Sequence, residues 1–338
     1  QAGGLQPEAY YDSDVFAVER DRIFGGNWVP VCRVEDVATP GDYVTYSLAG
    51  DPIVVTRTKA GELAAMGNVC RHRNMVLVEG SGNVAAMRCP YHHWTYRLDG
   101  TLAAAPDTAD LDGFDRDGFC LPRLGVEVWN GFVLVNTDTA AASLGPQLTG
   151  LDQKLDGFPV ADLVRIGSID WDQPWNWKLT VENYSESYHH QGIHPDTLQP
   201  IFPGELSRPV TGGDEPWMCL EHEIVVEGVD PLLVVTIYPL LLPTFVGSDV
   251  MVWLKLEVHG PAHSTLTTEV FATPEKAADE GFVEFEMETL RTINAQDELP
   301  NRGVFAGVTS RWAVPATLHP LEAGLEHFAA WYSRRMSA

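Results

Sequence analysis

The chain has 338 residues, 45% of them hydrophobic, and a formal net charge of −25 at pH 7. This length and apolar content suffice for two domains with buried cores. The acidic balance argues against a nucleic-acid-binding protein, because phosphate recognition needs a concentrated basic face, whereas a negative field favours the approach of a cationic substrate.

The chain also gives no sign of a membrane or secreted protein. No apolar run reaches 18 residues, so we expect no membrane span, and residues 231–246, which contain Pro239 and Pro243, predict buried strands. The N-terminus lacks the basic-then-apolar pattern of a signal peptide. Five cysteines, an odd number, do not indicate a disulfide scaffold. We therefore expect a cytoplasmic protein with free thiols.

The predicted elements fall into three parts along the chain. Residues 1–40 contain an amphipathic helix at 7–26, which Gly25 and Gly26 end. Residues 41–150 form a small β domain with short alternating runs and turn signals such as Asn130-Gly131. Residues 151–338 form a mixed domain. Its strands are expected at 163–170, 220–229, 232–238, 250–259 and 265–272, and its helices at about 275–299 and 320–335.

The small β domain contains the first group of metal-binding residue types. Its skeleton is Cys70-x-His72, then sixteen residues, then Cys89-x-x-His92. Two Cys and two His could bind zinc. The same set suits a Rieske [2Fe–2S] centre, in which two thiolates bind one iron and two imidazoles bind the other.

This region resembles the Rieske non-haem iron oxygenases, whose cluster-binding hairpins are similar to "NVCRHR", "CPYHHWTY" and "LDG" in this chain. The resemblance implies that Cys70, His72, Cys89 and His92 bind a [2Fe–2S] cluster. His93 stands where the family usually has Gly. The other cysteines, Cys32, Cys120 and Cys219, have no partner spacing and are interpreted as core or loop residues.

The second group of metal-binding residue types is "ENYSESYHHQGIHP", residues 182–195. A mononuclear iron(II) that activates O₂ needs two His and one carboxylate on one face. On a straight helix, Glu186, His190 and His194 are spaced i, i+4, i+8 and share that face. Helical geometry alone therefore favours His190 and His194 as the ligands.

The family resemblance implies a different pair, His189 and His194. Glu186 then takes the position of the acidic residue that connects this iron to the cluster of a neighbouring subunit. Gly192 weakens the helix, and Pro195 moves His194 toward extended geometry, which makes the five-residue spacing possible. We adopt this pair, and we expect His190 to lie beside the metal site or in the substrate pocket.

The third iron ligand must come from a distant part of the chain. The resemblance implies an Asp on a late helix, and Asp297 in "TLRTINAQDELPNRG" fits. Its neighbour Gln296 departs from the acidic residue that is usual there. Without the family, Glu288 and Glu298 are equally good candidates, and Asp196 is a weaker one.

The resemblance also implies partners and cofactors. Residues 176–190, "NWKLTVENYSESYHH", look like the branch that acts on carnitine, choline and betaines. The family implies a homotrimer with a Rieske cluster, mononuclear Fe(II) and O₂ as co-substrate. Electrons come from a separate flavin/iron-sulfur reductase, directly or through a ferredoxin, since the chain has no G-x-G-x-x-G nucleotide motif.

Three functions remain open from the sequence. The first is a monooxygenase or demethylase of a quaternary ammonium or N-methyl compound, the second an oxygenase of aromatic or polycyclic substrates, and the third a Rieske electron-transfer protein. An aromatic cage for a quaternary ammonium could draw on Phe202, Trp217, Tyr238, Phe245 and Trp253. The predicted fold class is α+β, with a small all-β Rieske domain and a catalytic domain whose antiparallel sheet is flanked by helices.

Overall fold

The computed structural model describes residues 3–337 except 109–111, 157, 159–161 and 223–231. The chain forms two compact units, a smaller one of residues 24–144 and a larger one of residues 1–23 and 145–338. The sequence predicted boundaries near 40 and 150. Residues 24–40 instead belong to the smaller domain, because β1 (Val29–Arg33) pairs with β10 (Phe132–Asn136) in its sheet.

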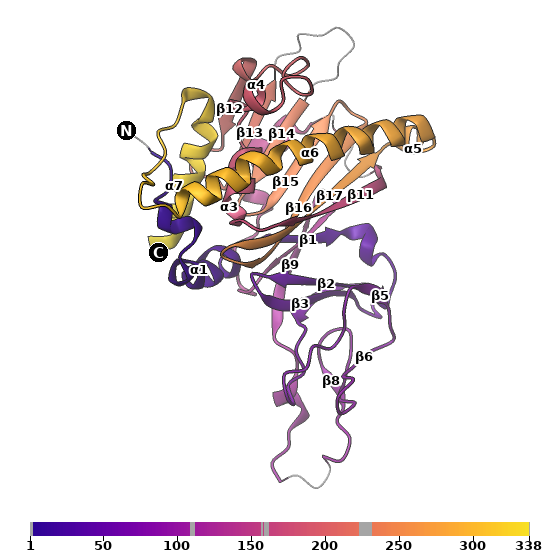
Figure 1. Ribbon diagram of the computed structural model, residues 1–338. Coiled ribbons are helices and arrows are strands. Elements are labelled where there is room, and N and C mark those ends of the chain that lie inside the picture. Colours follow the sequence, from indigo (N-terminus) through magenta and orange to yellow (C-terminus); the bar gives the residue numbers. More distant parts are fainter. Residues whose placement is uncertain (1–2, 109–111, 157, 159–161, 223–231, 338) are drawn as a thin grey trace. The chain divides into compact units, whose positions relative to one another are not determined.

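The smaller domain is built from antiparallel strands (Figure 1). One sheet has the order β1-β10-β9-β4-β3-β2-β5 and another the order β6-β7-β8. Asn130 and Gly131 both have positive φ, 46° and 78°, and join β9 to β10 as the Asn-Gly signal predicts. The remaining strands are β2 (Asp42–Leu48), β3 (Asp51–Arg57), β4 (Leu63–Gly67), β5 (Ser81–Asn83), β6 (Met87–Arg88), β7 (Thr95–Tyr96), β8 (Leu102–Ala104) and β9 (Arg123–Trp129).

The larger domain has one antiparallel sheet with the order β11-β17-β16-β15-β14-β13-β12. The strand expected at 220–229 begins earlier, as β13, and its part beyond residue 222 lies outside the described residues. The strands are β11 (Val164–Gln173), β12 (Ser207–Thr211), β13 (Trp217–His222), β14 (Leu232–Ile237), β15 (Leu241–Val246), β16 (Val250–Gly260) and β17 (His263–Ala272). The predicted α+β fold class is confirmed.

Helices surround this sheet, and the longest, α6, runs across one of its faces (Figure 1). Among the described residues, no helix is long and apolar enough to cross a membrane. The helices are α1 (Ser13–Glu19), α2 (Thr149–Lys154), α3 (Trp177–Tyr184), α4 (His190–Ile193), α5 (Pro274–Ala277), α6 (Glu280–Val308) and α7 (Ala323–Ser337).

The helix predicted at 7–26 is broken into three pieces. A 3₁₀ turn at Pro7–Tyr10 precedes α1, and a π-helical turn at Arg20–Gly25 follows it. The break lies at Asp12, whose carboxylate accepts the first free N–H groups of α1 and so starts a new helix there.

The two faces of the larger sheet are both covered, by different segments. Leu254 and Val252 lie in the hydrophobic cluster with Leu290 of α6. On the other face, Lys154 of α2 forms a 2.6 Å ion pair with Glu221 of β13. Side chains alternate between faces along a strand, so even-numbered residues of β13–β16 face α6 and odd-numbered ones face away.

A buried ion pair joins the N-terminal segment to the larger domain. Nζ of Lys178, in α3, lies 2.5 Å from Oε1 of Glu19, in α1, and both side chains are fully buried. The Trp177 indole and the Tyr332 hydroxyl donate further hydrogen bonds to the Glu19 carboxylate. Burial lowers the pKa of Lys178, and the charge of Glu19 offsets only part of that effect.

We expect Lys178→Met to lower the free energy of unfolding of the larger domain by about 3–5 kcal/mol, because it leaves a buried carboxylate without its cation. Urea unfolding followed by tryptophan fluorescence measures the loss. The double variant Glu19→Gln/Lys178→Met removes both charges and should regain more than half of it. A loss below about 1 kcal/mol in the single variant would contradict the role of this pair.

Candidate metal centres and substrate cavity

Two loops of the smaller domain carry the Cys and His residues of the first motif. The N–H of Asn74 donates to the carbonyl of Cys70, and the N–H of His93 donates to the carbonyl of Cys89, each over 3.0 Å. A second bond in each loop runs from the cysteine N–H to the carbonyl five residues later, over 2.8 Å. The two loops therefore have the same hydrogen-bond pattern and present their Cys and His residues in matching ways.

The loops place thiols inside and imidazoles outside. Cys70 and Cys89 are each 1% exposed, whereas His72 and His92 are exposed. The two imidazole rings lie 4.6 Å apart between centroids. Two buried sulfurs and two surface imidazoles fit a [2Fe–2S] group with thiolates on one iron and imidazoles on the other.

Two aromatic side chains that the sequence analysis did not assign support these loops. Trp94 stacks on the His72 ring at 5.0 Å. The Tyr96 hydroxyl lies 3.4 Å from Sγ of Cys70 and accepts the N–H of Arg71. Burial raises the pKa of Tyr96, so its phenol stays protonated and can donate to the sulfur.

His93, which stands where the family usually has Gly, has a positive φ of 61°. That left-handed conformation is easy for Gly and costs other residues roughly 1–2 kcal/mol. The imidazole is exposed, and His93 is the left-handed residue of its loop, as Asn74 is with a φ of 58°.

We expect His93→Gly to make the cluster loop more stable by about 1 kcal/mol and His93→Val to make it less stable. The measurement is the urea concentration at which the visible absorbance of the cluster disappears. Equal midpoints for the two variants would show that the backbone conformation at this position does not limit loop stability.

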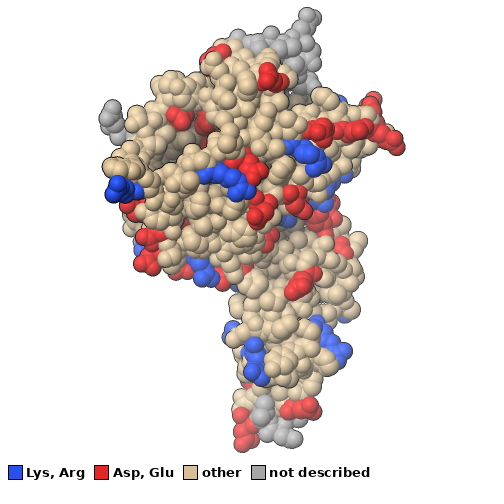
Figure 2. All heavy atoms as spheres, in the orientation of Figure 1, with Lys and Arg blue, Asp and Glu red and all other residues tan. Residues whose placement is uncertain are grey.

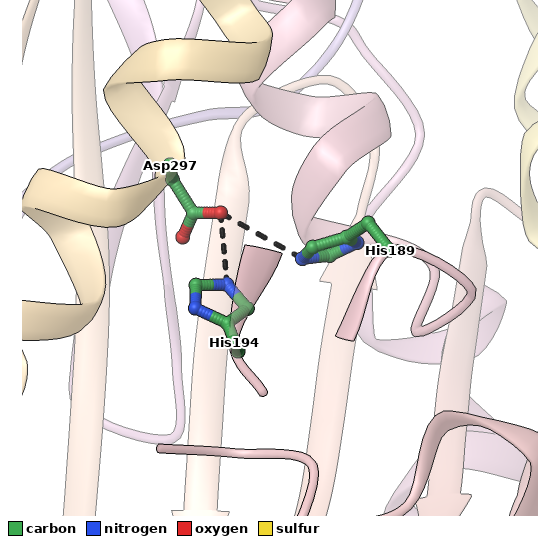
Figure 3. A group of neighbouring side chains, drawn as sticks. All are labelled: His189, His194 and Asp297. Carbon is green, nitrogen blue, oxygen red and sulfur yellow. Dashed lines mark hydrogen bonds and ion pairs between the residues drawn. The ribbon is translucent and has the colours of Figure 1, made fainter. Parts of the chain in front are cut away.

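The second site lies in the larger domain, where His189, His194 and Asp297 converge (Figure 3). Oδ1 of Asp297 lies 3.0 Å from Nε2 of His194 and 3.6 Å from Nε2 of His189. One ligand atom from each residue falls within 4.8 Å of the others. Two imidazole nitrogens and one carboxylate oxygen on one face are the donor set that a mononuclear non-haem iron requires.

The outer nitrogen of each imidazole is held by another side chain. Nδ1 of His189 lies 2.5 Å from Oε1 of Glu186. Nδ1 of His194 lies 2.8 Å from Oε1 of Gln296, which also accepts the Thr197 hydroxyl. Such partners fix the ring orientation and the tautomer at metal sites, and both Nε2 atoms are thereby turned toward Asp297.

His190 does not join this group. Its Nδ1 lies 2.9 Å from the carbonyl oxygen of Phe202, to which it donates. The helical argument for His190 fails because α4 is a single turn that ends at Ile193, so His194 lies beyond it. His194 has φ −118° and ψ 42°, so Pro195 is associated with the end of the helix but does not place His194 in an extended conformation.

Burial and charge act differently on these histidines. Burial lowers the pKa of His194, but the hydrogen bond and charge of Asp297, with the bond to Gln296, outweigh it and raise the pKa overall. Burial lowers the pKa of His190 to about 4 and that of His222 to about 4. Both of the latter are therefore neutral at pH 7.

The other carboxylates considered from the sequence are not part of the metal group. Glu288 forms a 3.6 Å ion pair with Arg291, and Glu298 forms a 2.6 Å ion pair with Arg302. Asp196 is exposed. Of the candidates on α6, Asp297 alone belongs to the histidine group, as far as the described residues show.

A cavity of about 810 Å³ adjoins the metal group, and His189, His194 and Asp297 form part of its wall. His190 and Phe202 lie on the wall, as expected, but Trp217, Tyr238, Phe245 and Trp253 do not. The odd-numbered strand residues point to the opposite face of the sheet, where Phe245 lies 5.5 Å from Phe158. Tyr238 packs against α7 instead, and its hydroxyl bonds His327. The aromatic wall residues that the sequence analysis missed are Trp171, Trp175, Tyr184 and Phe285.

Two protein families match this chain in order. The Rieske [2Fe-2S] domain family matches residues 27–115, and the family "Ring hydroxylating alpha subunit (catalytic domain)" matches residues 160–235. The first match contains all four residues of the cluster motif, and the second contains the histidine segment. The family resemblance drawn from the sequence is thus confirmed, and with it a Rieske cluster and a mononuclear iron as cofactors.

The chain is similar in sequence to oxygenase subunits. It is 37% identical to the carnitine monooxygenase oxygenase subunit of Acinetobacter baumannii over 193 residues, 56% of this chain and 52% of that one. It is 34% identical to the glycine betaine monooxygenase oxygenase subunit of Chromohalobacter salexigens over 197 residues, 58% of this chain and 44% of that one. The matched region thus spans about half the length of these relatives.

The fold is similar to that of the quaternary ammonium Rieske monooxygenase CntA in complex with its substrate L-carnitine. The TM-score is 0.87 at 26% identity, over 99% of this chain and 96% of that one. The chain thus contains, in this order, a segment similar to the Rieske [2Fe-2S] domain and a segment similar to the catalytic domain of ring-hydroxylating alpha subunits.

Proposed function

We propose that the chain is the terminal oxygenase of a multicomponent enzyme. It would use O₂ and electrons from a separate reductase to hydroxylate or oxidatively demethylate a small quaternary ammonium or N-methyl compound. The observation that carries this proposal is the convergence of His189, His194 and Asp297 at the wall of a large cavity, in a chain that also has a Rieske domain. Monooxygenation is favoured because the carnitine and glycine betaine relatives, which are 37% and 34% identical, are named monooxygenases.

In this proposal His189, His194 and Asp297 hold the iron, and Cys70, His72, Cys89 and His92 hold the cluster. When bound, these groups supply the one-electron and O₂ chemistry that side chains cannot supply. His194 is fully buried, whereas His189 and Asp297 keep 16% and 21% of their side-chain surface exposed. Two of the three side chains that would hold the iron thus keep part of their surface exposed, and all three lie on the cavity wall.

Glu186 is proposed to connect the two centres of different copies of the chain. One carboxylate oxygen bonds the His189 ring, and the other accepts the N–H groups of Tyr188 and His189. These bonds fix the carboxylate against one iron ligand. In a homotrimer, an exposed cluster histidine of a neighbouring copy would approach it from the other side. A carboxylate between two imidazoles fixes the orientation of both rings.

The remaining residues of the site bind and orient the substrate. Trp171, Trp175 and Phe202 give the wall aromatic faces, which attract a cationic ammonium group by about 2 kcal/mol when water is excluded. His190 and His222 lie parallel at 6.1 Å and present neutral imidazoles. These groups position an N-methyl carbon without proton transfer to the substrate.

The test is a substrate panel with a surrogate reductase, in which O₂ uptake and product are measured together. The panel contains carnitine, choline, betaines and simple aromatic compounds. We expect uptake coupled to product with at least one quaternary ammonium compound, and none in the His189→Ala variant. Coupled turnover with aromatic compounds alone would overturn the substrate class and favour a ring-hydroxylating enzyme.

We also infer a reducing compartment such as the cytoplasm. All five cysteines are free, and thiols at Cys70 and Cys89 must stay unpaired to bind iron.

A further inference from the structure

The cavity, called the channel below, extends along several turns of α6. The wall residues of this helix include Glu286, Leu290, Ile293 and Asp297, whose spacing of four, three and four residues puts them on one stripe. A helix rises 1.5 Å per residue, so Glu286 lies roughly 16 Å along the axis from the metal ligand Asp297. The channel therefore has room for a substrate longer than the group that reacts.

The wall opposite α6 is mostly aliphatic. It is formed by even-numbered residues of neighbouring strands, which alternate with residues that face away. These residues are Leu220, Leu232, Val234, Val246, Val252, Leu254 and Leu266. This surface suits a hydrocarbon body, and its polar even-numbered members are His222 and Thr244.

The charged groups of the wall are all acidic. They are Asp172, Glu186, Glu286, Glu288, Asp297 and Glu298. No Lys or Arg lines the cavity among the described residues, and the sequence has no Lys or Arg in the segments outside them. Arg302 lies near, 5.4 Å from the Trp175 ring, but it is paired with Glu298 at 2.6 Å.

We infer that the substrate carries a positive charge and a hydrocarbon body but no carboxylate. This inference rests on the proposed function and narrows its substrate class. A carboxylate at the end of the cavity remote from His189, His194 and Asp297 gives up its hydration and finds acidic groups such as Glu286 instead of a Lys or Arg, which is unfavourable. The substrates named with CntA, L-carnitine and gamma-butyrobetaine, both carry a carboxylate, so this chain would differ from that relative.

Glu286 is the residue that would attract the cation on its way to the metal. Its carboxylate has no hydrogen-bond or ion-pair partner among the described residues. Burial raises its pKa, and the charge of Lys276 offsets this only in part. Figure 2 shows further acidic side chains gathered at the α5 end of the larger domain, from which α6 starts. A cation at this carboxylate restores a favourable environment for both charges.

The first test compares ligands that differ in one group, on the holoenzyme, by calorimetric binding and by O₂ uptake. Pentyltrimethylammonium and gamma-butyrobetaine are similar in length and differ in the carboxylate. We expect pentyltrimethylammonium to bind roughly 100-fold more tightly. Equal or tighter binding of gamma-butyrobetaine would overturn the inference.

A second pair of ligands tests the proposed function separately from the inference about the carboxylate. Choline and its neutral carbon analogue 3,3-dimethylbutan-1-ol differ in the positive charge. Tighter binding of choline supports a cationic substrate. Equal binding would overturn the quaternary ammonium class, while the first pair still decides whether the cavity rejects a carboxylate.

The role of Glu286 is tested with a matched glutamate on the same helix. Glu286→Gln should weaken binding of pentyltrimethylammonium by about 5- to 10-fold and leave the neutral alcohol unchanged. Glu284→Gln removes the same charge from an exposed position outside the cavity wall and should change neither ligand. Equal effects of the two variants would assign the attraction to the overall charge instead of Glu286.

Discussion

The substitution Glu186→Gln is expected to leave the iron and sulfide content unchanged and to lower turnover by about 100-fold. The carboxylate bonds Nδ1 of His189 and two backbone N–H groups. Gln keeps the size and one acceptor oxygen, but it loses the negative charge and one of the two acceptors. The measurements are product formation with a surrogate reductase and metal analysis of the same sample.

Asp196→Asn is the control for this experiment. Asp196 is an exposed carboxylate two residues from His194, so its amide variant should keep both iron content and turnover. If Glu186→Gln turned over at the wild-type rate with full iron, the proposed connection between centres would be wrong. A loss of iron in Glu186→Gln would instead show that Glu186 mainly holds His189 in place.

The second prediction with a large expected effect concerns the adjacent residues His189 and His190. His189→Ala should lose the mononuclear iron and all coupled turnover, because two of the three ligands cannot hold it at ordinary iron concentrations. The cluster should remain, since its motif lies in the other domain. His190→Ala should keep both centres, because the His190 ring bonds a backbone carbonyl and is absent from the metal group.

Iron content and the visible absorbance of the cluster distinguish the two variants. Loss of the same iron from His190→Ala, with full iron in His189→Ala, would restore the ligand pair that helical spacing favours. Loss of cluster absorbance in either variant would contradict the separation of the two sites.

The smaller domain could be predicted well from the sequence, because its signals are local. The Asn130-Gly131 turn has the positive φ values that this dipeptide favours. The C-x-H and C-x-x-H pairs lie on short loops whose hydrogen bonds span only four or five residues. The N-terminal boundary of this domain was harder to predict, because β1 joins the sheet by pairing with β10, which lies about a hundred residues later in the chain.

The choice between His189 and His190 could not be made from spacing. The spacing of Glu186, His190 and His194 puts them on one face only if the helix is continuous, whereas α4 is one turn long. The helix ends at Ile193, directly after Gly192. The residues before it show no hydrophobic periodicity from which the length of the helix could be predicted. The match to the family supplied the pair that the structure brings together.

Three of the aromatic residues chosen for the pocket lie on the wrong face of the sheet. Trp217, Phe245 and Trp253 have odd numbers, and the cavity face of β13–β16 is even. A strand that is buried on both faces has no polar side to mark its register. Trp171 was missed for another reason: the strand was expected to end at residue 170, whereas β11 runs to Gln173, which also lies on the wall.

The end of α6 that carries Asp297 was also predicted incorrectly from the sequence. The helix was expected to end near residue 299, but it passes through Pro300 and continues to Val308. Proline removes one N–H and so leaves a carbonyl one turn earlier without its usual bond. That carbonyl belongs to Gln296, and the side-chain amide of Asn301 donates to the next one, that of Asp297, over 2.9 Å beside the metal group.

The central claim is that one chain holds both a Rieske cluster and a separate iron at His189, His194 and Asp297. Iron and acid-labile sulfide per chain in the purified, iron-reconstituted wild-type protein test it most directly. We predict three irons and two sulfides, two of the irons belonging to the cluster. Two irons and two sulfides per chain, with no further Fe(II) bound after reconstitution, would contradict the claim. That result would favour an electron-transfer Rieske protein.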